Sequence, residues 1–469
     1  MKRSTANFPV PWRARFAGLF VALALTDCGG GGSAPYCSPM CQLDKYASLV
    51  GGTLTGLVGS GLTFQFDGTP LSTQYNGPAA NGTHGFAIFT LDNSWDLTVD
   101  TQPTNPSQTC VVTNGQGGPS YSNITNIVVT CTTNPARFVY VTNSGSNNVS
   151  AYTVDAASGT LSPIAGSPFA TGNLPVAIAV DPTGSYVYVV NQTDATISAF
   201  AIDRASGALT EVGGSPFSTG PTPTSVAVAK SWPPESGTYV YVTSGTTGSV
   251  TPCQIIAGGA LSCISSSTLS PTGASPSSVV SAPLLSLLYV GNQGDNTVSV
   301  LNVGEGGVVT GSPFPAGAGP RAVAVDISGN YVYVANSTSN TLSGYQTSSA
   351  GPLTRLSGSP YATGNTPDAV AADLSDNFVY VANKGSNNVS AYALGAGGTL
   401  TALSGSPFTA GGGPVGIVVD PTNQFVYVAN AGSADISVFT IDRDNGALST
   451  VSGSPYAAGS GPSAIAISQ

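Results

Sequence analysis

The sequence predicts an all-β protein, with a seven-bladed β-propeller preceded by a small β-sandwich. Of its 469 residues 93 are Gly or Pro, which is too many for a helical protein, while a 41% hydrophobic content supplies a core. Short strands separated by Gly and Pro turns fit both numbers. One tetrapeptide also recurs seven times, at spacings close to the ~40–50 residues that a four-stranded blade occupies.

The first 27 residues are predicted to be an export signal. Four basic residues precede an apolar run from Phe16 to Leu25, whose about ten residues are half of what a membrane span needs. Leu25-Thr26-Asp27-Cys28 and the glycines after it resemble the lipobox and tether of bacterial lipoproteins, with Cys28 as the lipidated residue and residues 28–36 as the linker. We therefore expect an exported protein anchored to the outer membrane, facing the periplasm or the surface. Secretion without lipid stays open, because Asp27 stands where a small residue is usual.

The net charge argues against nucleic acid as a partner, and the cysteines predict disulfides. Without residues 1–27 the chain keeps 8 basic and 21 acidic residues, a net charge of −13, which would repel nucleic acid. Besides Cys28, six cysteines form three close pairs, and these predict disulfides in an oxidising compartment. The pairs are Cys37 with Cys41, Cys110 with Cys131, and Cys253 with Cys263. Zinc would need four converging ligands, so we expect no metal. We also expect no cofactor and a monomer.

Residues 37–133 contain about six short β-rich runs, which predict the small sandwich. The runs cover residues 53–58, 62–66, 85–89, 96–99, 109–113 and 124–130. Cys110 and Cys131 would join neighbouring strands, which helps a unit this small to stay folded. The unit resembles the immunoglobulin-like spacers that precede binding domains in bacterial surface proteins. The one histidine, His84, lies beside Gly85 and is interpreted as an exposed polar residue, because no other candidate ligand accompanies it.

Residues 137–469 repeat themselves. Tyr-Val-x-Asn begins at Tyr140, Tyr188, Tyr289, Tyr333, Tyr380 and Tyr427, and a seventh copy at Tyr241 ends in Ser244 instead of Asn. Six repeats begin with a Pro-led strand and the first lacks one, while an extra such strand stands at 462–467. That last strand is predicted to complete the first blade and close the ring, which removes two sheet edges.

Two recurring motifs are interpreted as turns. Asp181-Pro182-Thr183-Gly184 and its copies suit type I turns, since Asp bonds back to turn amides and Pro presets the backbone angle. A calcium site is the weaker interpretation of these aspartates, because one carboxylate per blade does not converge on one ion. Gly-Ser-Pro followed by Phe or Tyr marks the passage from one blade to the next.

Tyr-Val-x-Asn, the Gly-x-Leu strand and the seven blades resemble the YVTN-repeat and lactonase β-propeller family, which includes 6-phosphogluconolactonase-type enzymes and surface proteins without established chemistry. In the enzymes one blade carries His-x-His and a Gly-x-Asp-Arg loop, and the next carries Gly-Pro-Arg-His and a later Asn-Glu. Here Gly319-Pro320-Arg321 matches, but Ala322 replaces the His and Ser337 follows Asn336 in place of the Glu. Asp295 matches the loop aspartate, and Asn296 replaces the arginine.

Arg321, Asp368, Asp295 and Asn336 are therefore the candidate ligand or channel residues, and no catalytic residue is assigned. Arg321 and Asp368 directly follow the Pro of successive innermost strands. The pair could orient a carboxylate or sugar, or it could be a simple channel-lining salt bridge. The Asn that ends each Tyr-Val-x-Asn is expected to serve its blade, because a feature shared by all repeats usually does.

Two functions follow from this resemblance. The first is a cell-envelope lipoprotein whose propeller is a non-catalytic scaffold that binds an envelope protein or a carbohydrate, with the membrane reached only through the lipid. The second is a lactonase-like enzyme that uses Arg321 and an unrecognised acid–base pair, since lactone opening needs a base for water and an acid for the leaving oxygen.

Overall fold

Strands of two separate units make up the computed structural model, which describes residues 48–89, 94–104, 106–118, 122–230, 237–263, 272–282, 285–303, 307–347 and 351–469. The first unit is formed mainly by residues before Thr133 and the second by Thr133–Gln469. Short 3-10 helices are η2 (Pro78–Ala80), η4 (Ala257–Gly259) and η5 (Ala396–Gly398).

Several predictions for the start of the chain fall outside the described residues. They are the export signal, the lipidated Cys28, the linker and one of the three disulfides. Cys37 and Cys41 both precede residue 48, so the structure does not confirm a disulfide between Cys37 and Cys41. That pairing stays a prediction, whereas the other two disulfides are present in the structure.

The N-terminal unit contains two four-stranded sheets around one core of buried residues that includes Leu54, Phe64 and Ile127. One sheet has the order β4-β1-β8-β6 and the other β3-β2-β5-β7. The strands are β1 (Ser48–Thr55), β2 (Ser60–Phe66), β3 (Thr69–Asn76), β4 (Gly82–Phe89), β5 (Trp95–Thr101), β6 (Gln108–Thr113), β7 (Gln116–Gly117) and β8 (Ile124–Thr133). A disulfide joins Cys110 to Cys131, as predicted. The immunoglobulin-like assignment stays a prediction.

The second unit is a seven-bladed propeller, in which each blade is a meander of antiparallel strands. The innermost strands are β42 (Pro462–Ser468), β13 (Pro175–Val180), β18 (Pro223–Lys230), β22 (Pro276–Ser281), β27 (Pro320–Val325), β32 (Pro367–Ala372) and β37 (Pro414–Val419). The second strands, which carry Tyr-Val-x-Asn or its Ser244 variant, are β9 (Phe138–Asn143), β14 (Tyr186–Asn191), β19 (Thr238–Ser244), β23 (Leu287–Asn292), β28 (Tyr331–Asn336), β33 (Phe378–Asn383) and β38 (Phe425–Asn430).

Towards the rim each blade continues with a third and a short fourth strand. The third strands are β10 (Asn148–Val154), β15 (Thr196–Ile202), β20 (Ser249–Ile255), β24 (Thr297–Asn302), β29 (Thr341–Gln346), β34 (Asn388–Leu394) and β39 (Asp435–Ile441). The fourth strands are β11 (Leu161–Pro163), β16 (Leu209–Glu211), β21 (Leu261–Cys263), β25 (Gly307–Val308), β30 (Thr354–Arg355), β35 (Leu400–Ala402) and β40 (Leu448–Thr450). In the third blade, Cys253 of β20 and Cys263 of β21 face each other and form the predicted disulfide.

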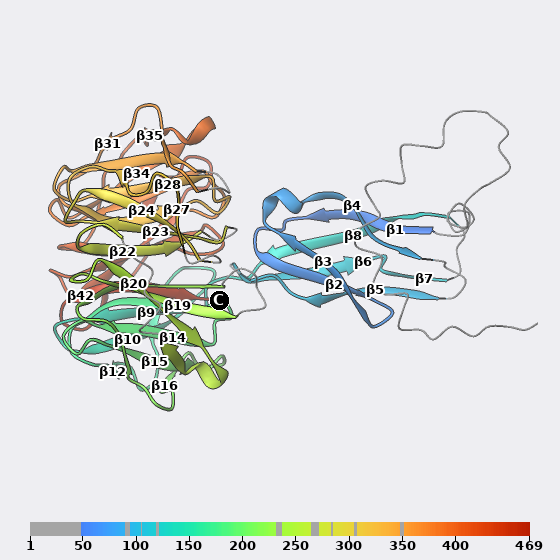
Figure 1. Cartoon of the computed structure of the whole chain (residues 1–469), viewed down its shortest axis with the longest axis horizontal. Helices are drawn as coiled ribbons and strands as arrows, with labels where there is room; N and C mark the ends of the chain where they lie inside the picture. The colour runs from blue at the N-terminus through green and yellow to red at the C-terminus, as the bar shows by residue number, and fades with distance from the viewer. Residues whose placement is uncertain are drawn as a thin grey trace, which may run out of the picture. The chain divides into compact units, whose positions relative to one another are not determined.

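The last strand of the chain belongs to the first blade. β42 pairs antiparallel with β9, from Pro462 opposite Asn143 to Ser468 opposite Phe138. Figure 1 shows β42, in red, among the green strands that begin the propeller. Because the two ends of the repeat region share one sheet, the ring is closed by main-chain hydrogen bonds, and β42 covers the inner edge of β9.

The Gly-Ser-Pro motif holds the segment between two blades against the third strand of the blade before it. In six blades its serine hydroxyl accepts a hydrogen bond from a main-chain N–H in the third strand, for example from Ala151 to Ser167 at 2.9 Å and from Ala391 to Ser406 at 2.9 Å. The aromatic residue after it then adds a two-residue strand against the same third strand. These strands are β12 (Phe169–Ala170), β17 (Phe217–Ser218), β26 (Phe314–Pro315), β31 (Tyr361–Ala362), β36 (Phe408–Thr409) and β41 (Tyr456–Ala457).

The tyrosine of Tyr-Val-x-Asn joins neighbouring blades. Tyr380 is fully buried, and its hydroxyl donates to the Gly446 carbonyl in a turn of the next blade at 3.0 Å. The same bond joins Tyr140 to Gly207, Tyr188 to Gly259, Tyr333 to Gly398 and, across the closure, Tyr427 to Gly159, while Tyr289 bonds to the Thr347 hydroxyl. Burial raises the pKa of Tyr289 to about 12, and it raises the pKa of the other five as well, so all stay protonated donors.

We predict that Tyr380→Phe lowers the free energy of unfolding by about 1–2 kcal/mol, because it leaves the buried Gly446 carbonyl without its donor. Denaturant unfolding measures the change. Tyr361→Phe is the matched control, since its exposed hydroxyl bonds to Ser357 within its own segment. Equal stabilities of the two variants would contradict the role assigned to Tyr380.

The turns between the first and second strands contain buried carboxylates, as the turn interpretation of the aspartates requires. In one of them Asp373 accepts hydrogen bonds from the main chain of Asn377 and Phe378 at 2.8 and 2.9 Å. Asp376, in the same turn, accepts from Ile327 N of the preceding blade at 3.1 Å. Burial first, and then the charge of nearby Asp326, raises the pKa of Asp376 to about 6. Burial also raises the pKa of Asp326.

We predict that Asp376→Asn stabilises the protein above pH 6 and has no effect near pH 4. The folded state holds a proton on Asp376 that the unfolded state releases between about pH 4 and pH 6, so stability falls as the pH rises through this range. After a discount for partial exposure we expect about 1 kcal/mol at pH 7.5. Asn423 already fills this turn position in the next blade and makes the same bond, to Leu374 N at 2.9 Å.

Melting temperatures of wild type and variant between pH 4 and pH 8 check this prediction. Asp444→Asn, at an exposed residue of an outer turn, removes the same charge and serves as the control. A gain that does not depend on pH, or an equal gain in the control, would show that Asp376 is not the titrating group.

Candidate functional site

The innermost strands surround a central channel with a cavity of about 370 Å³. Each of these strands starts at a Pro that pairs with the last residue of the second strand, as Pro320 does with Asn336 and Pro367 with Asn383. The residue after the Pro and the residue after the Asn therefore come to the same end of every blade. The residues after the Pro all line the cavity, and they are Val176, Thr224, Ser277, Arg321, Asp368, Val415 and Ser463.

Arg321 and Asp368 form an ion pair across two successive blades. Arg321 Nε donates to Asp368 Oδ1 at 3.0 Å, with the side chains 44% and 9% exposed. Among the residues that the structure describes, no other ion pair is found. Within the same residues, the terminal nitrogens of Arg321 and the second carboxylate oxygen of Asp368 have no hydrogen-bond partner. These groups are thus available to a ligand in the channel.

The neutral polar groups of the cavity are already used to join blades. Ser463, Thr224 and Ser277 donate to the carbonyls of Pro175, Pro276 and Pro320 in the next blade, at 2.6, 2.7 and 2.7 Å. Where Val176 lacks a hydroxyl, Gln192 Nε2 donates to Pro223 O at 3.3 Å instead. The Arg321–Asp368 pair also joins two blades, so a structural role and ligand binding are both compatible with its position.

The other two candidate residues do not line the channel. Asp295 accepts from Ala274 N at 2.8 Å and from the Thr297 hydroxyl at 2.7 Å, which makes it a turn residue. Asn336 is fully buried, and its amide nitrogen donates to the hydroxyls of Thr341 and Ser343 at 3.2 and 3.0 Å.

The residue that replaces the family's loop arginine has a structural contact as well. Asn296 accepts from Gly319 N at 2.8 Å, in the loop that leads to Pro320 and Arg321 of the next blade. Asn147, Asn340 and Asn387 make the same link from their turns to the following blade. Asn296 therefore follows the pattern of the repeat, and it positions the segment that carries Arg321.

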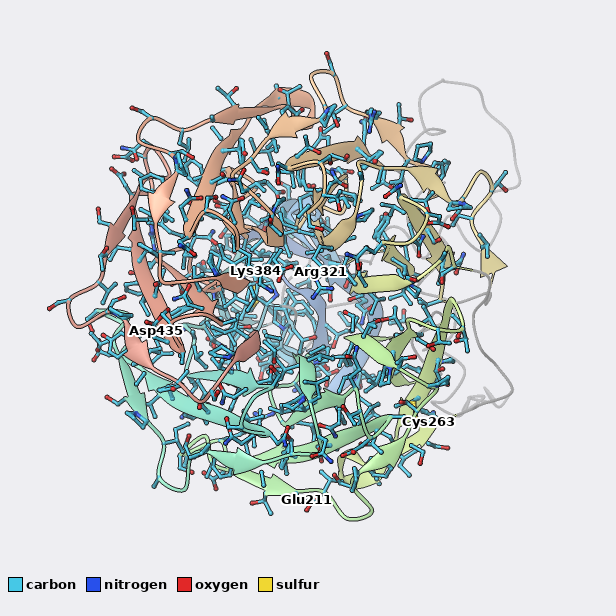
Figure 2. The ribbon with its side chains drawn as sticks, turned by 90° about the vertical axis from the view of Figure 1, so that its left-hand side faces the viewer. Glu211, Cys263, Arg321, Lys384 and Asp435 are labelled. Atoms are coloured by element: carbon cyan, nitrogen blue, oxygen red, sulfur yellow. A yellow bond between two sulfur atoms is a disulfide. The ribbon has the colours of Figure 1, made fainter. Side chains whose placement is uncertain are left out.

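Lys384 was missed by the sequence analysis. It directly follows Asn383, the position that Gln192 occupies in its blade, and it is exposed. Figure 2 shows Lys384 and Arg321 toward the centre of the ring, with Glu211 and Cys263 at the rim. The signal that could have found it is its place directly after Tyr-Val-x-Asn, where a cation breaks the repeat.

A second hollow, of about 470 Å³, lies in the N-terminal unit beside β5 and β6. Asp96 is its one titratable lining residue besides Cys110, whose sulfur is in a disulfide. His84 does not line it: the ring is partly buried, contacts the Ala80 carbonyl and meets Tyr75 edge-on with ring centroids 5.2 Å apart. Among its described lining residues this hollow has no cationic side chain beside Asp96, whereas the channel holds the Arg321–Asp368 ion pair, so the propeller channel is the better candidate site.

No group of three or more His, Cys, Asp or Glu side chains in the described part of the chain is arranged to hold a metal ion. In the same residues, no helix has the length and apolar character needed to cross a membrane.

Solved structures share the propeller. They include a periplasmic gluconolactonase of Pseudomonas aeruginosa (22% identity, TM-score 0.58, 72% of this chain and 99% of that one). A proposed 6-phosphogluconolactonase from Bacteroides fragilis gives 17% identity and a TM-score of 0.60 over 71% and 98%. A protein from Lactobacillus plantarum is 22% identical, with a TM-score of 0.58, over 72% of this chain and 100% of that one. No curated protein matches the chain by sequence.

The comparison with family models agrees with the seven blades described above. The model of the lactonase, 7-bladed β-propeller family matches residues 108–228, 231–366 and 312–465, which is more than half of the chain. With its seven blades, its closed ring and this match, the chain belongs to the lactonase, seven-bladed β-propeller family.

Proposed function

We propose that the propeller binds a sugar lactone at the mouth of its channel and hydrolyses it. One observation carries this proposal: the ion pair of Arg321 and Asp368 lies in the cavity with free donors on one side chain and a free carboxylate oxygen on the other. Membership of the lactonase family supports the choice of substrate class. The likeness to a gluconolactonase supports the fold that such a site would need.

In this mechanism the terminal nitrogens of Arg321 bind the lactone carbonyl oxygen and stabilise the negative charge that develops on it. Asp368 accepts a proton from water as the water oxygen attacks the carbonyl carbon. The ring C–O bond then breaks, and the proton held by Asp368 passes to the leaving alkoxide. The products are a hydroxyl and a carboxylic acid, so one water molecule is consumed and Asp368 returns to its starting state.

A second candidate is the non-catalytic scaffold, which would bind an envelope protein or a carbohydrate. One observation favours it: where the family's enzymes have their His and Glu, this chain has Ala322, which lines the cavity, and Ser337. Ser337 donates to the Gly319 carbonyl at 3.0 Å and so serves the loop. In this alternative the N-terminal unit would act as an immunoglobulin-like spacer.

We predict that the wild type hydrolyses at least one lactone in a panel of δ- and γ-lactones of sugar acids, above the rate in buffer. Asp368→Asn should lower kcat about 10²–10⁴-fold, because it removes the base. Arg321→Ala should lower kcat/KM by a similar factor, because it removes both the oxyanion donor and the partner of Asp368. Initial rates of acid release measure all three.

Glu211→Gln is the control, because Glu211 ends β16 at the rim of the ring (Figure 2) and keeps full activity if the channel is the site. No turnover of any lactone, or turnover that survives both channel substitutions, would refute the enzymatic proposal. Saturable binding of a sugar acid that requires Arg321 but comes without turnover would identify the scaffold instead.

We also propose that the chain is exported and anchored through a lipid on Cys28. The basic and apolar start of the chain and the run of glycines that directly follows Cys28 support this, since two signals of this kind are those of a bacterial lipoprotein. An outer-membrane anchor would leave the propeller outside the cytoplasm, where its disulfide is stable.

We predict that Cys28→Ala moves the protein from the membrane fraction to the soluble fraction of the producing bacterium. Mass spectrometry of the wild-type N-terminal peptide should find a lipid on Cys28. A peptide cleaved before residue 28 but without lipid would indicate secretion, as Asp27 allows.

A further inference from the structure

We propose that Lys384 is a second anionic-group anchor at the channel mouth, so that the propeller prefers sugar acids with a carboxylate at each end. Arg321 would bind one end and Lys384 the other. This inference rests on the proposed binding of sugar acids and lactones at Arg321, and it adds the class of ligand that the site selects.

The repeat places Lys384 at the rim of the channel. In the second blade the equivalent residue, Gln192, lines the cavity, and its amide reaches across to the Pro223 carbonyl on the next innermost strand. The main chain of Lys384 is held in the same way. Its N–H donates to Thr366 O at 2.9 Å, and the N–H of Gln192 donates to Leu174 O at 2.9 Å. Each bond ties the residue to the segment just before the Pro of its own blade.

The two cations belong to neighbouring blades and lie at the same end of those blades. Arg321 is the second residue of β27, and Lys384 directly follows β33, whose last residue Asn383 pairs with Pro367. Figure 2 shows both side chains toward the centre of the ring. Asp368 follows Pro367, so it belongs to the same blade as Lys384 and the same ion pair as Arg321.

The three charged side chains described at this mouth are two cations and one carboxylate, with a sum of +1. The chain as a whole has a net charge of −10. Arg321 and Asp368 are the charged residues that line the cavity in the described structure. Lys384 adds a second positive charge at the same end of its blade, because it follows Asn383, which pairs with Pro367. In the described residues Lys384 is in no ion pair. Lys384 is thus an exposed ammonium at the same end of the blades as Arg321, whose charge Asp368 already balances, and it is suited to a second anionic group on the ligand.

Isothermal titration calorimetry with glucarate and gluconate tests the proposal, because these hydroxylated six-carbon acids differ by one terminal carboxylate. We expect the wild type to bind glucarate about tenfold more tightly than gluconate. Lys384→Gln should lower glucarate affinity about tenfold and change gluconate affinity less than twofold. Glutamine already occupies this position as Gln192, so the variant suits the blade, and an unchanged melting temperature verifies its fold.

Arg355→Gln is the charge-matched control, because Arg355 is an exposed cation on the outer strand β30 and its loss should leave both affinities unchanged. Arg321→Gln should weaken both acids. If the wild type binds both acids equally, or if Lys384→Gln weakens both by the same factor, the role of Lys384 is overturned while binding at Arg321 stands. If neither acid binds, sugar-acid binding at Arg321 fails together with it.

Discussion

The hydrogen bond from a buried tyrosine to a carbonyl of the next blade is the contact on which the ring depends. Each blade of a propeller contacts only its two neighbours, so the ring needs a stabilising contact that recurs from one blade to the next. Here the tyrosine hydroxyl supplies direction, and the glycine that accepts it allows the close approach: a Cβ on Gly446 would lie 2.4 Å from Phe378. Phe378 and Tyr380 of the same strand therefore both contact the turn at Gly446, one through its ring and the other through its hydroxyl.

Closure makes this contact cooperative. Tyr427 bonds to Gly159 across the junction between the last and first blades, next to the pairing of β42 with β9. Every blade then has two neighbours, and loosening one interface strains the others. A ring held in this way keeps its channel residues in place, and the hydrogen bonds and the ion pair of the channel add to these contacts. That is why an arginine, an aspartate and a lysine can stand where other blades have neutral residues.

The repeats made the blades predictable from the sequence. Strands with mostly exposed residues and the directions of turn side chains were harder to predict. Tyr-Val-x-Asn located the second strands because it recurs, and the missing Pro-led strand pointed to β42. In the N-terminal unit β3 was not foreseen, because its residues are mostly exposed and show no apolar alternation. At the site, Arg321 and Asp368 could be paired from register alone. Asp295 could not be placed outside the channel, because only the backbone decides which side a turn residue faces. For Asn336, the recurrence of the Asn in the other blades favoured the structural role that the structure shows.

The scarcity of charge in this chain gives its channel a definite chemistry. In a cavity whose hydroxyls are already bonded to proline carbonyls, a ligand can replace water only at groups that remain unsatisfied. Those are the ends of Arg321 and Asp368, and Lys384 at the rim. A neutral oxygen of the ligand, such as a lactone carbonyl, can accept an ordinary hydrogen bond from the guanidinium or the ammonium, whereas an anion gains a stronger, charge-assisted bond at each. The site therefore favours acidic ligands, and hydrolysis would require in addition that Asp368 reach both a water molecule and the leaving oxygen.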